Sequence, residues 1–210
     1  MKVTRYPQSC LLLEKEGHKI VIDPGSFFAA QHSVNELEGI EAALYTHEHA
    51  DHYDPAIATA LREKGVPLYC NASTANVIHT KGACTVIENN QQFEVAGFSI
   101  TAYDLPHCLL ADGSDGPQNT GYLVDGVFFH PGDGKELAGL QARSMALPIA
   151  GPDISPLDAF NFAKQLGVTI AIPVHYDYFK EDAHVLKDTA MRLAMPFDLR
   201  VLAAGESTEL

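Results

Sequence analysis

The first half of the chain alternates short apolar runs with turn-forming residues. Residues 9–25, SCLLLEKEGHKIVIDPG, predict a hairpin of two strands around a turn at Gly17. Residues 55–64, PAIATALREK, predict a helix, because proline suits the first helical position and Asp54 can cap it. The other elements expected in this half are strands over 42–46 and 66–70, a short helix over 73–82, and successive antiparallel strands over 84–87, 91–95 and 98–105.

In the second half, strands and helices alternate more regularly. A loop rich in Gly, Asp and Pro covers residues 104–119, and two strands then meet at a turn at Asp125-Gly126. No linker, tandem repeat or low-complexity segment interrupts the pattern, so we expect a single α/β domain over residues 1–210. The elements expected here are strands over 120–126, 127–133, 143–151 and 168–175, and helices over 155–167 and 182–194.

The composition is that of an ordinary globular protein, with 46% hydrophobic and 20% charged residues. No apolar run approaches the roughly 18 residues that span a bilayer. The apolar stretch near the N-terminus is too short for a signal peptide, so we expect a cytoplasmic protein. The four cysteines form no CxxC pair, and we expect them to be buried small side chains in a reducing compartment.

The charge balance argues against polyanionic partners. The chain has 27 acidic and 14 basic residues, a net charge of −13, and no cluster of Lys or Arg. Proteins that bind nucleic acid or an anionic membrane surface present a basic face. We therefore expect a small-molecule substrate, with neither nucleic acid nor membrane as a partner.

Residues 44–55, LYTHEHADHYDP, concentrate histidines and acids directly after an apolar run. Side chains two residues apart on an extended backbone point the same way, so His47, His49 and Asp51 can converge on one cavity. His52 begins the turn into the next helix and can reach a neighbouring point. Imidazole and carboxylate groups are ligands for zinc and similar cations. Because a catalytic ion usually takes three protein ligands, this cluster predicts two ions.

Three later residues can complete such a site. His107, Asp133 and His175 each follow an expected strand and lie beside a turn-forming Pro or Gly. Polar residues at such strand-to-loop junctions commonly form sites in layered α/β folds. The remaining histidines are expected to have surface or structural roles: His18, His32, His79, His130 and His184.

At these residues the chain resembles the metallo-β-lactamase superfamily of metal-dependent hydrolases. The resemblance rests on the strand pair ending in VIDPG, the THEHADH signature, and the later His, Asp and His in the family's order. It implies a four-layered αβ/βα sandwich with the metals at one edge. It also implies a ligand set in which His47, His49 and His107 bind a first metal, Asp51, His52 and His175 bind a second, and Asp133 bridges both.

Differences among the branches of the superfamily indicate which branch the chain resembles most. The lactamases proper carry Arg at the position of His52 and Cys at that of Asp133, which disfavours antibiotic hydrolysis. Flavodiiron proteins carry Glu at the position of His49 and add a flavodoxin domain, whereas Glu48 of this chain points the other way. The segment 146–179 is most similar to the compact L-ascorbate-6-phosphate lactonase-like branch. The chain departs from that branch at two places. Ala150 stands where the branch has Gly, and Gln8-Ser9 stands where the branch has Gly-His.

The resemblance and the ligand types together predict a binuclear hydrolase. Two divalent ions, Zn²⁺ first and Mn²⁺ or Fe²⁺ as compatible choices, would generate a bridging hydroxide that cleaves a small ester, lactone, thioester or phosphodiester. Asp51 is the expected catalytic base or proton shuttle. The roles of two further residues stay open. Tyr176 either faces the substrate pocket or packs in the shell behind it. Asp177 is a candidate for hydrogen bonding to one of the metal-binding histidines. The alternatives are a di-iron redox enzyme of the same fold and a noncatalytic metal-binding or regulatory protein.

Overall fold

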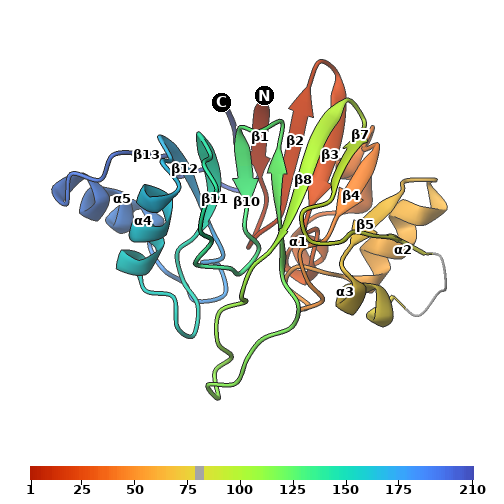
Figure 1. The fold of residues 1–210 in the computed structure, drawn as a ribbon. Coiled ribbons are helices and arrows are strands. Elements are labelled where there is room, and N and C mark those ends of the chain that lie inside the picture. The colour runs from red at the N-terminus through yellow and green to blue at the C-terminus, as the bar shows by residue number, and fades with distance from the viewer. Residues whose placement is uncertain (79–82) are drawn as a thin grey trace.

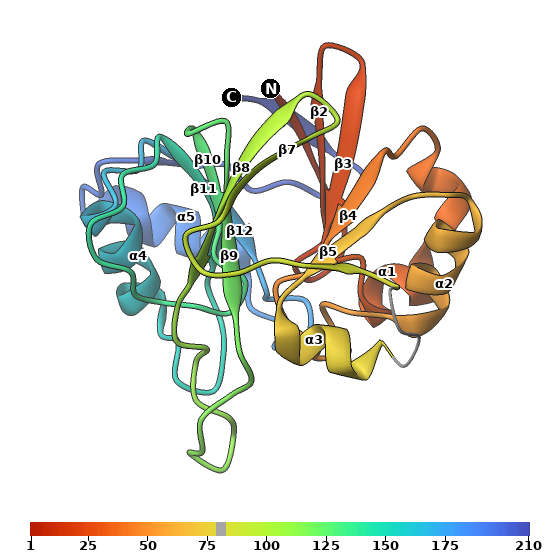
Figure 2. The same ribbon diagram turned by 45° about the vertical axis from the view of Figure 1, so that its right-hand side comes forward.

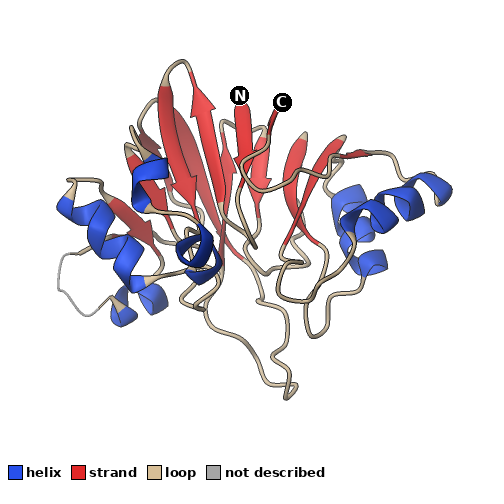
Figure 3. Cartoon of the chain, turned by 180° about the vertical axis from the view of Figure 1, so that it is seen from behind, coloured by secondary structure: helices blue, strands red, loops and turns tan. Residues whose placement is uncertain are grey.

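Two sheets lie face to face in the centre of the molecule, and helices cover the outer face of each sheet (Figures 1 and 2). The computed structural model describes residues 1–78 and 83–210. Viewed from behind, the strands occupy the middle and the helices both flanks (Figure 3). The fold is therefore the four-layered αβ/βα sandwich that the family resemblance implies.

The first sheet is antiparallel at one end and parallel at the other. The expected hairpin forms around Gly17, with Leu13 opposite Ile20, and the strands that follow it run parallel to one another. In spatial order the strands are β14 (Ser207–Glu209), β1 (Lys2–Arg5), β2 (Leu11–Lys15), β3 (His18–Ile22), β4 (Ala42–Leu44), β5 (Leu68–Cys70) and β6 (Thr85–Val86).

The second sheet has the same mixed character. Its first four strands along the chain form an antiparallel meander, and the last three pair in parallel with it. In spatial order they are β13 (Asp198–Leu199), β12 (Ile170–Val174), β11 (Ser144–Pro148), β10 (Phe128–His130), β9 (Thr120–Val124), β8 (Phe98–Asp104) and β7 (Gln92–Val95).

The helices form the two outer layers. Asp54 caps its helix as expected, because its carboxylate accepts from the backbone N–H groups of Ala56 and Ile57 at 2.9 Å. None of the helices in residues 1–78 and 83–210 is long and apolar enough to cross a membrane. The first sheet carries α1 (Ser26–Gln31), the 3-10 helix η1 (Val34–Leu37), α2 (Pro55–Glu63) and α3 (Ala72–Val77), and the second carries α4 (Pro156–Gln165) and α5 (Ala183–Arg192).

The period-two alternation of the strands explains why three apolar layers form. On β3, Ile20 and Ile22 point between the sheets, whereas Val21 points toward the helices of the first layer. On β9, Tyr122 points between the sheets and Leu123 packs under the helices of the other side. Because both faces of each sheet are covered, the central strands are apolar almost throughout.

Three expectations about elements need correction. The strand expected over 84–87 does not pair with β7: β6 instead runs parallel to β5 at the edge of the first sheet, and the chain then crosses to the second sheet. The helix expected over 73–82 is observed as α3, and residues 79–82, with His79, lie outside the described residues. The short elements β1, β13, β14, α1 and η1 were not predicted.

Candidate metal centre

The predicted donor residues lie where strands of both sheets end at one edge of the sandwich, the lower edge in Figure 1. The first sheet supplies the loop after β4, which carries His47 to His52. The second sheet supplies the connections after β8, β10 and β12. The Asn71 side chain holds the first loop in place, since its Nδ2 donates to the backbone carbonyl of Thr46 at 2.9 Å. Glu48 points away, as expected, and accepts from the Ser73 hydroxyl at 2.6 Å.

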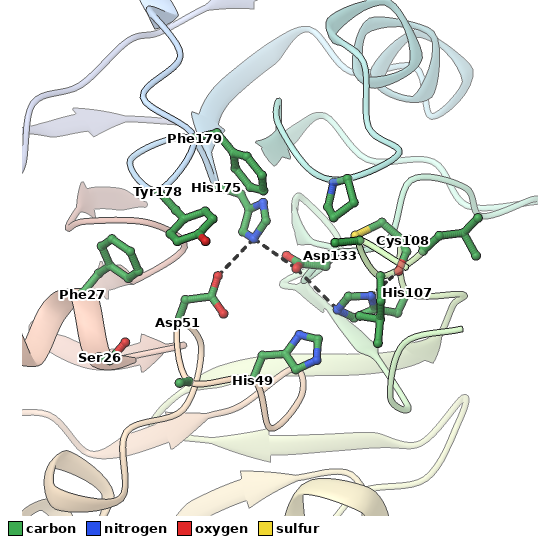
Figure 4. A pocket seen from close by; sticks show the side chains of 15 residues that line it. Ser26, Phe27, His49, Asp51, His107, Cys108, Asp133, His175, Tyr178 and Phe179 are labelled. Carbon is green, nitrogen blue, oxygen red and sulfur yellow. Dashed lines mark hydrogen bonds and ion pairs between the residues drawn. The ribbon is translucent and has the colours of Figure 1, made fainter. Parts of the chain in front are cut away.

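The structure brings all seven predicted donor residues together in two adjoining groups, which we call the cage. Asp133 lies between the groups: its Oδ1 is 3.0 Å from His52 Nε2, and its Oδ2 is 3.1 Å from His175 Nε2 and 3.5 Å from His107 Nε2. Within each group the donor atoms lie within 4.8 Å of one another. Figure 4 shows the donor residues that face the cavity, His49, Asp51, His107, Asp133 and His175. The groups are His47, His49, His107 and Asp133, and Asp51, His52 and His175.

Four histidines of the cage share one orientation, in which Nδ1 faces an oxygen outside the cage. The Thr46 hydroxyl donates to Asp23, so its oxygen is free to accept from His47. A neutral imidazole with its proton on Nδ1 leaves a lone pair on Nε2. The Nδ1 partners are Thr46 Oγ1 for His47 at 3.0 Å, Asp23 Oδ2 for His52 at 2.7 Å, Ala150 O for His175 at 2.6 Å, and Cys108 O for His107.

This donor set fits a bound cation. The Nε2 atoms of His47 and His107 lie 3.3 Å apart, and in these tautomers both present lone pairs to each other. His52 Nε2 and Asp133 Oδ1 are buried and lie 3.0 Å apart without the geometry of a hydrogen bond, and neither makes a hydrogen bond to any other part of the chain that the structure describes. Buried polar atoms without partners are costly. Cations bound within the two donor groups would satisfy these atoms.

The pKa shifts within the cage also favour a bound cation. Burial and the neighbouring His52 lower the pKa of His47 well below its usual value, so His47 is neutral and able to bind a metal. Burial also lowers the pKa of His175, but the Asp133 and Asp51 carboxylates outweigh it and raise the pKa to about 10. For His52, the same two carboxylates and Asp23 outweigh burial and raise the pKa. The carboxylates therefore attract positive charge into the cage, which a divalent cation would supply in place of protons.

Asp23 is a supporting residue that sequence reasoning missed. It lies in the VIDPG segment, where the pattern indicates only a turn, and its φ of +52° is consistent with a turn. Its side chain is fully buried and accepts from Thr46 N at 2.8 Å while bonding His52 Nδ1. A carboxylate behind a metal-binding histidine fixes the ring and raises its basicity. The only available signal was the position of Asp23 at the end of a buried strand, two residues before Gly25.

Asp177, the residue considered for that role, has a different one. Its carboxylate bonds the Arg5 guanidinium and accepts from Gln8 N at 2.6 Å. The Tyr176 ring lies 4.4 Å from the Arg5 guanidinium carbon, so it packs behind the site and does not line the cavity. Asp177 thereby supports Gln8, whose own side chain donates to Asp51 Oδ2 at 3.0 Å.

The cage forms the floor of a cavity of about 300 Å³. Asp51 faces this cavity, and its side chain is 24% exposed. None of the described residues that line it is Lys or Arg. The apolar part of the wall consists of Phe27, Ala50, Leu109, Leu110, Ala111, Pro152, Tyr178 and Phe179 (Figure 4).

The other described histidines lie outside the cavity wall, as expected. His130 is buried and donates from Nε2 to Ser9 O at 3.0 Å, which gives it a structural role. His18 and His32 lie next to acidic side chains, Glu41 and Glu36, on the surface. His184 is an exposed residue of α5.

Comparisons with known proteins agree with this geometry. Residues 18–176 match the family described as the beta-lactamase superfamily domain. A UPF0173 metal-dependent hydrolase of Korarchaeum cryptofilum is 30% identical over 228 residues, with 100% of both chains covered. Protein Rv0786c of Mycobacterium tuberculosis is 26% identical over 190 residues, 87% of each chain. Igni18, a metallo hydrolase of Ignicoccus hospitalis, has the same fold, with a TM-score of 0.80 at 20% identity over 100% of this chain and 98% of that chain. The chain therefore belongs to the metallo-β-lactamase superfamily of metal-dependent hydrolases.

Proposed function

We propose that the chain is a binuclear hydrolase whose substrate is a small, uncharged ester, lactone or thioester with an apolar group. The observation that carries the proposal is the place of the cage, whose donor atoms converge at the floor of a mostly apolar cavity. Histidine nitrogens and carboxylate oxygens suit zinc, manganese and iron, with zinc as our first choice. In this arrangement His47, His49 and His107 would hold the first cation, Asp51, His52 and His175 would hold the second, and Asp133 would serve both.

Asp51 is the proposed base. Two divalent cations bound here would lower the pKa of a coordinated water toward about 7 and would polarise the bond to be cleaved. Gln8 Nε2 donates to Asp51 Oδ2, which also lies 3.2 Å from His175 Nε2. Asp51 is therefore held through one oxygen, and its Oδ1 remains to accept a proton from the attacking water and pass it to the leaving group.

The cavity wall favours an uncharged substrate. Phe27 and Tyr178 pack edge to face with ring centroids 6.2 Å apart, and Tyr178 and Phe179 pack the same way at 5.1 Å. Such a wall buries an alkyl or aryl group favourably and offers a phosphate no cationic partner. We therefore place acyl substrates ahead of phosphodiesters. For the same reason we do not carry over the phosphorylated substrate of the lactonase-like branch.

Metal analysis and a substrate panel test this proposal together. We expect purified protein to bind two equivalents of zinc or manganese and to remain colourless. It should hydrolyse p-nitrophenyl butyrate, an aliphatic lactone or a thioester faster than bis-p-nitrophenyl phosphate. A chelator should abolish the activity and added metal should restore it. His175→Gln should remove both bound metal and turnover, whereas the matched surface change His184→Gln should leave both unchanged.

Three results would overturn the proposal. Iron with visible absorbance and no hydrolysis would favour the redox alternative. Two bound equivalents of metal without turnover of any substrate would favour the noncatalytic alternative. Faster cleavage of the phosphodiester than of every acyl compound would contradict the argument from the apolar wall.

A further inference from the structure

Two cysteines outside the cage lie closer together than any pattern in the sequence indicates. Cys70 ends β5 and is buried, and half-buried Cys84 lies directly before β6. Their sulfur atoms are 2.7 Å apart. The expectation that the cysteines are buried holds for Cys10, Cys70 and Cys108, whereas Cys84 is only half-buried.

The sheet holds the two sulfur atoms in this position. Cys70 pairs in register with Val86, and the Ile87 N–H donates to Cys70 O at 2.8 Å. Cys84 is two residues before Val86, so its side chain lies on the same face of the sheet as that of Cys70. A disulfide requires a sulfur separation of about 2.0 Å, so the bond needs only a small side-chain adjustment.

We propose that Cys70 and Cys84 are a reversible oxidation site, which forms an intramolecular disulfide by exchange with a low-molecular-weight disulfide such as oxidised glutathione. The half-buried Cys84 thiolate attacks one sulfur of the oxidant and releases one thiolate. Cys70 then loses its proton and attacks the Cys84 sulfur, which releases the second thiol. Two protein thiols are oxidised and one glutathione disulfide is reduced to two thiols, so atoms and electrons balance.

The environments of the two thiols suit these different roles. The hydrogen bond from Cys70 lowers the pKa of Cys84, against the opposing effect of burial. The same hydrogen bond and burial raise the pKa of Cys70. The more exposed sulfur is therefore the more easily ionised one, as the first attacking group must be.

The disulfide would act as a clamp around α3. The helix begins directly after Cys70, and its cap Asn71 bonds Thr46 O at the start of the loop that carries His47. Ser73 and Thr74 of the same helix bond Glu48 in that loop. Because the sulfur atoms are already close, oxidation should stabilise this region without moving the loop.

The test is incubation of the full chain with oxidised glutathione, followed by thiol trapping under denaturing conditions and peptide mass analysis. We expect wild type to lose two thiols, to yield one cross-linked peptide pair joining Cys70 to Cys84, and to recover both thiols with dithiothreitol. Closing a loop of this length should raise Tm by roughly 6–12 °C. Cys10 and Cys108, both 1% exposed, should remain reduced.

Variants separate the steps of the exchange. Cys70→Ser should stop at a stable glutathione adduct on Cys84, and Cys84→Ser should form neither adduct nor cross-link. The matched control Cys108→Ser should cross-link as wild type does. The proposal fails if wild type forms no Cys70–Cys84 cross-link, if it accumulates the glutathione adduct instead, or if the cross-link involves Cys10 or Cys108. The wild-type arm decides the matter even where a variant does not fold.

Discussion

At the scale of single residues, each of four cage histidines turns Nδ1 to an oxygen behind it and Nε2 to the cage. Two of these oxygens belong to backbone carbonyls, Cys108 O and Ala150 O, and no side-chain substitution removes them. Only Asp23 contributes a charge, and it is fully buried against His52. The supporting layer therefore has one member whose charge can be removed by a nearly isosteric change.

Asp23→Asn is the prediction at this position. The amide keeps the size of the carboxylate but removes the negative charge behind His52. We expect metal affinity to fall by about 10–100-fold, the usual effect of losing a group that orients a metal-binding histidine. Competition with a chromophoric chelator measures the affinity directly.

The control for this change is Asp125→Asn. Asp125 is also a turn aspartate with positive φ, but its carboxylate bonds Lys15 at 2.7 Å, outside the cavity wall. The Asp125→Asn variant should bind metal with the affinity of the wild-type protein. Equal affinities in Asp23→Asn and wild type would show that Asp23 has no part in the metal site.

Sequence reasoning predicts which residues gather in the cage better than it predicts the residues that support them. His47, His49, Asp51 and His52 stand out because one short segment concentrates them after an apolar run. Asp23 escaped notice because an Asp-Pro-Gly sequence is explained fully by its turn. The cavity wall has no local pattern at all, since Phe27 of α1 and Leu109 and Tyr178 of two loops are distant in the chain and only the fold brings them together.

At the scale of elements, two close contacts set the position of the loop that carries the first four donors. At its end, Asp54 caps α2. At its middle, the turn between β3 and α1 packs against it, and a Cβ on Gly25 would lie 2.2 Å from Asp51 O. Mutations at the two positions should have different effects. The Asp54 cap stabilises a helix, whereas the missing side chain of Gly25 leaves space for the backbone of Asp51.

Asp54→Ala should affect stability alone. The change removes a side chain that accepts two backbone N–H groups at the start of α2, which costs about 1 kcal/mol. For a chain of this size, Tm should fall by roughly 2–4 °C. Thermal unfolding checks this, with metal affinity measured on the same sample. A loss of metal binding at full stability would contradict the assignment of Asp54 as a cap only.

Gly25→Ala should affect the site as well. The φ of −87° at Gly25 is open to alanine, so the only obstacle is space. The added methyl must displace the backbone of Asp51 and His52, and overpacking of this kind costs about 1–3 kcal/mol. We expect lower stability together with weakened metal binding.

The control is Gly17→Ala in the β2–β3 turn. A Cβ there meets nothing within 4 Å, and only the left-handed φ of +86° opposes it. Gly17→Ala should therefore lose stability while it binds metal as wild type does. If Gly25→Ala binds metal with unchanged affinity, the loop adjusts more easily than this packing indicates.

The elements that sequence reasoning predicted correctly are those with their own local signals. Gly17 marks the hairpin, and Asp54 with Pro55 marks the start of α2. The error at β6 arose because 84–87 has the right composition for a strand but nothing that specifies its partner. The partner follows from the order of the elements: α3 lies between β5 and β6, and a strand–helix–strand unit pairs its strands in parallel, so the chain crosses to the second sheet only after β6.

At the scale of the whole molecule, the cage draws its donors from both sheets. His47, His49, Asp51 and His52 follow a strand of the first sheet, whereas His107, Asp133 and His175 follow strands of the second. Each of the two donor groups contains residues from both sides. Bound cations would therefore join the two sheets at an edge where the apolar layer between them ends.

Removal of metal should consequently destabilise the entire fold and not the loops alone. A ligand that binds only the folded state at 100 to 1,000 times its Kd adds about 2.7–4.1 kcal/mol of stability. For a chain of 210 residues this corresponds to a fall in Tm of roughly 5–15 °C on chelation. The fall should reverse when Zn²⁺ is returned.

Two variants test this prediction. His175→Gln removes a residue of the cage that follows a strand of the second sheet, so this variant should have the lower Tm before chelation and respond little to the chelator. The matched change His18→Gln, at an exposed histidine beside Glu41, should keep the full response. If metal-loaded wild type keeps its Tm after complete chelation, the two sheets hold together without cations and the cage serves chemistry alone.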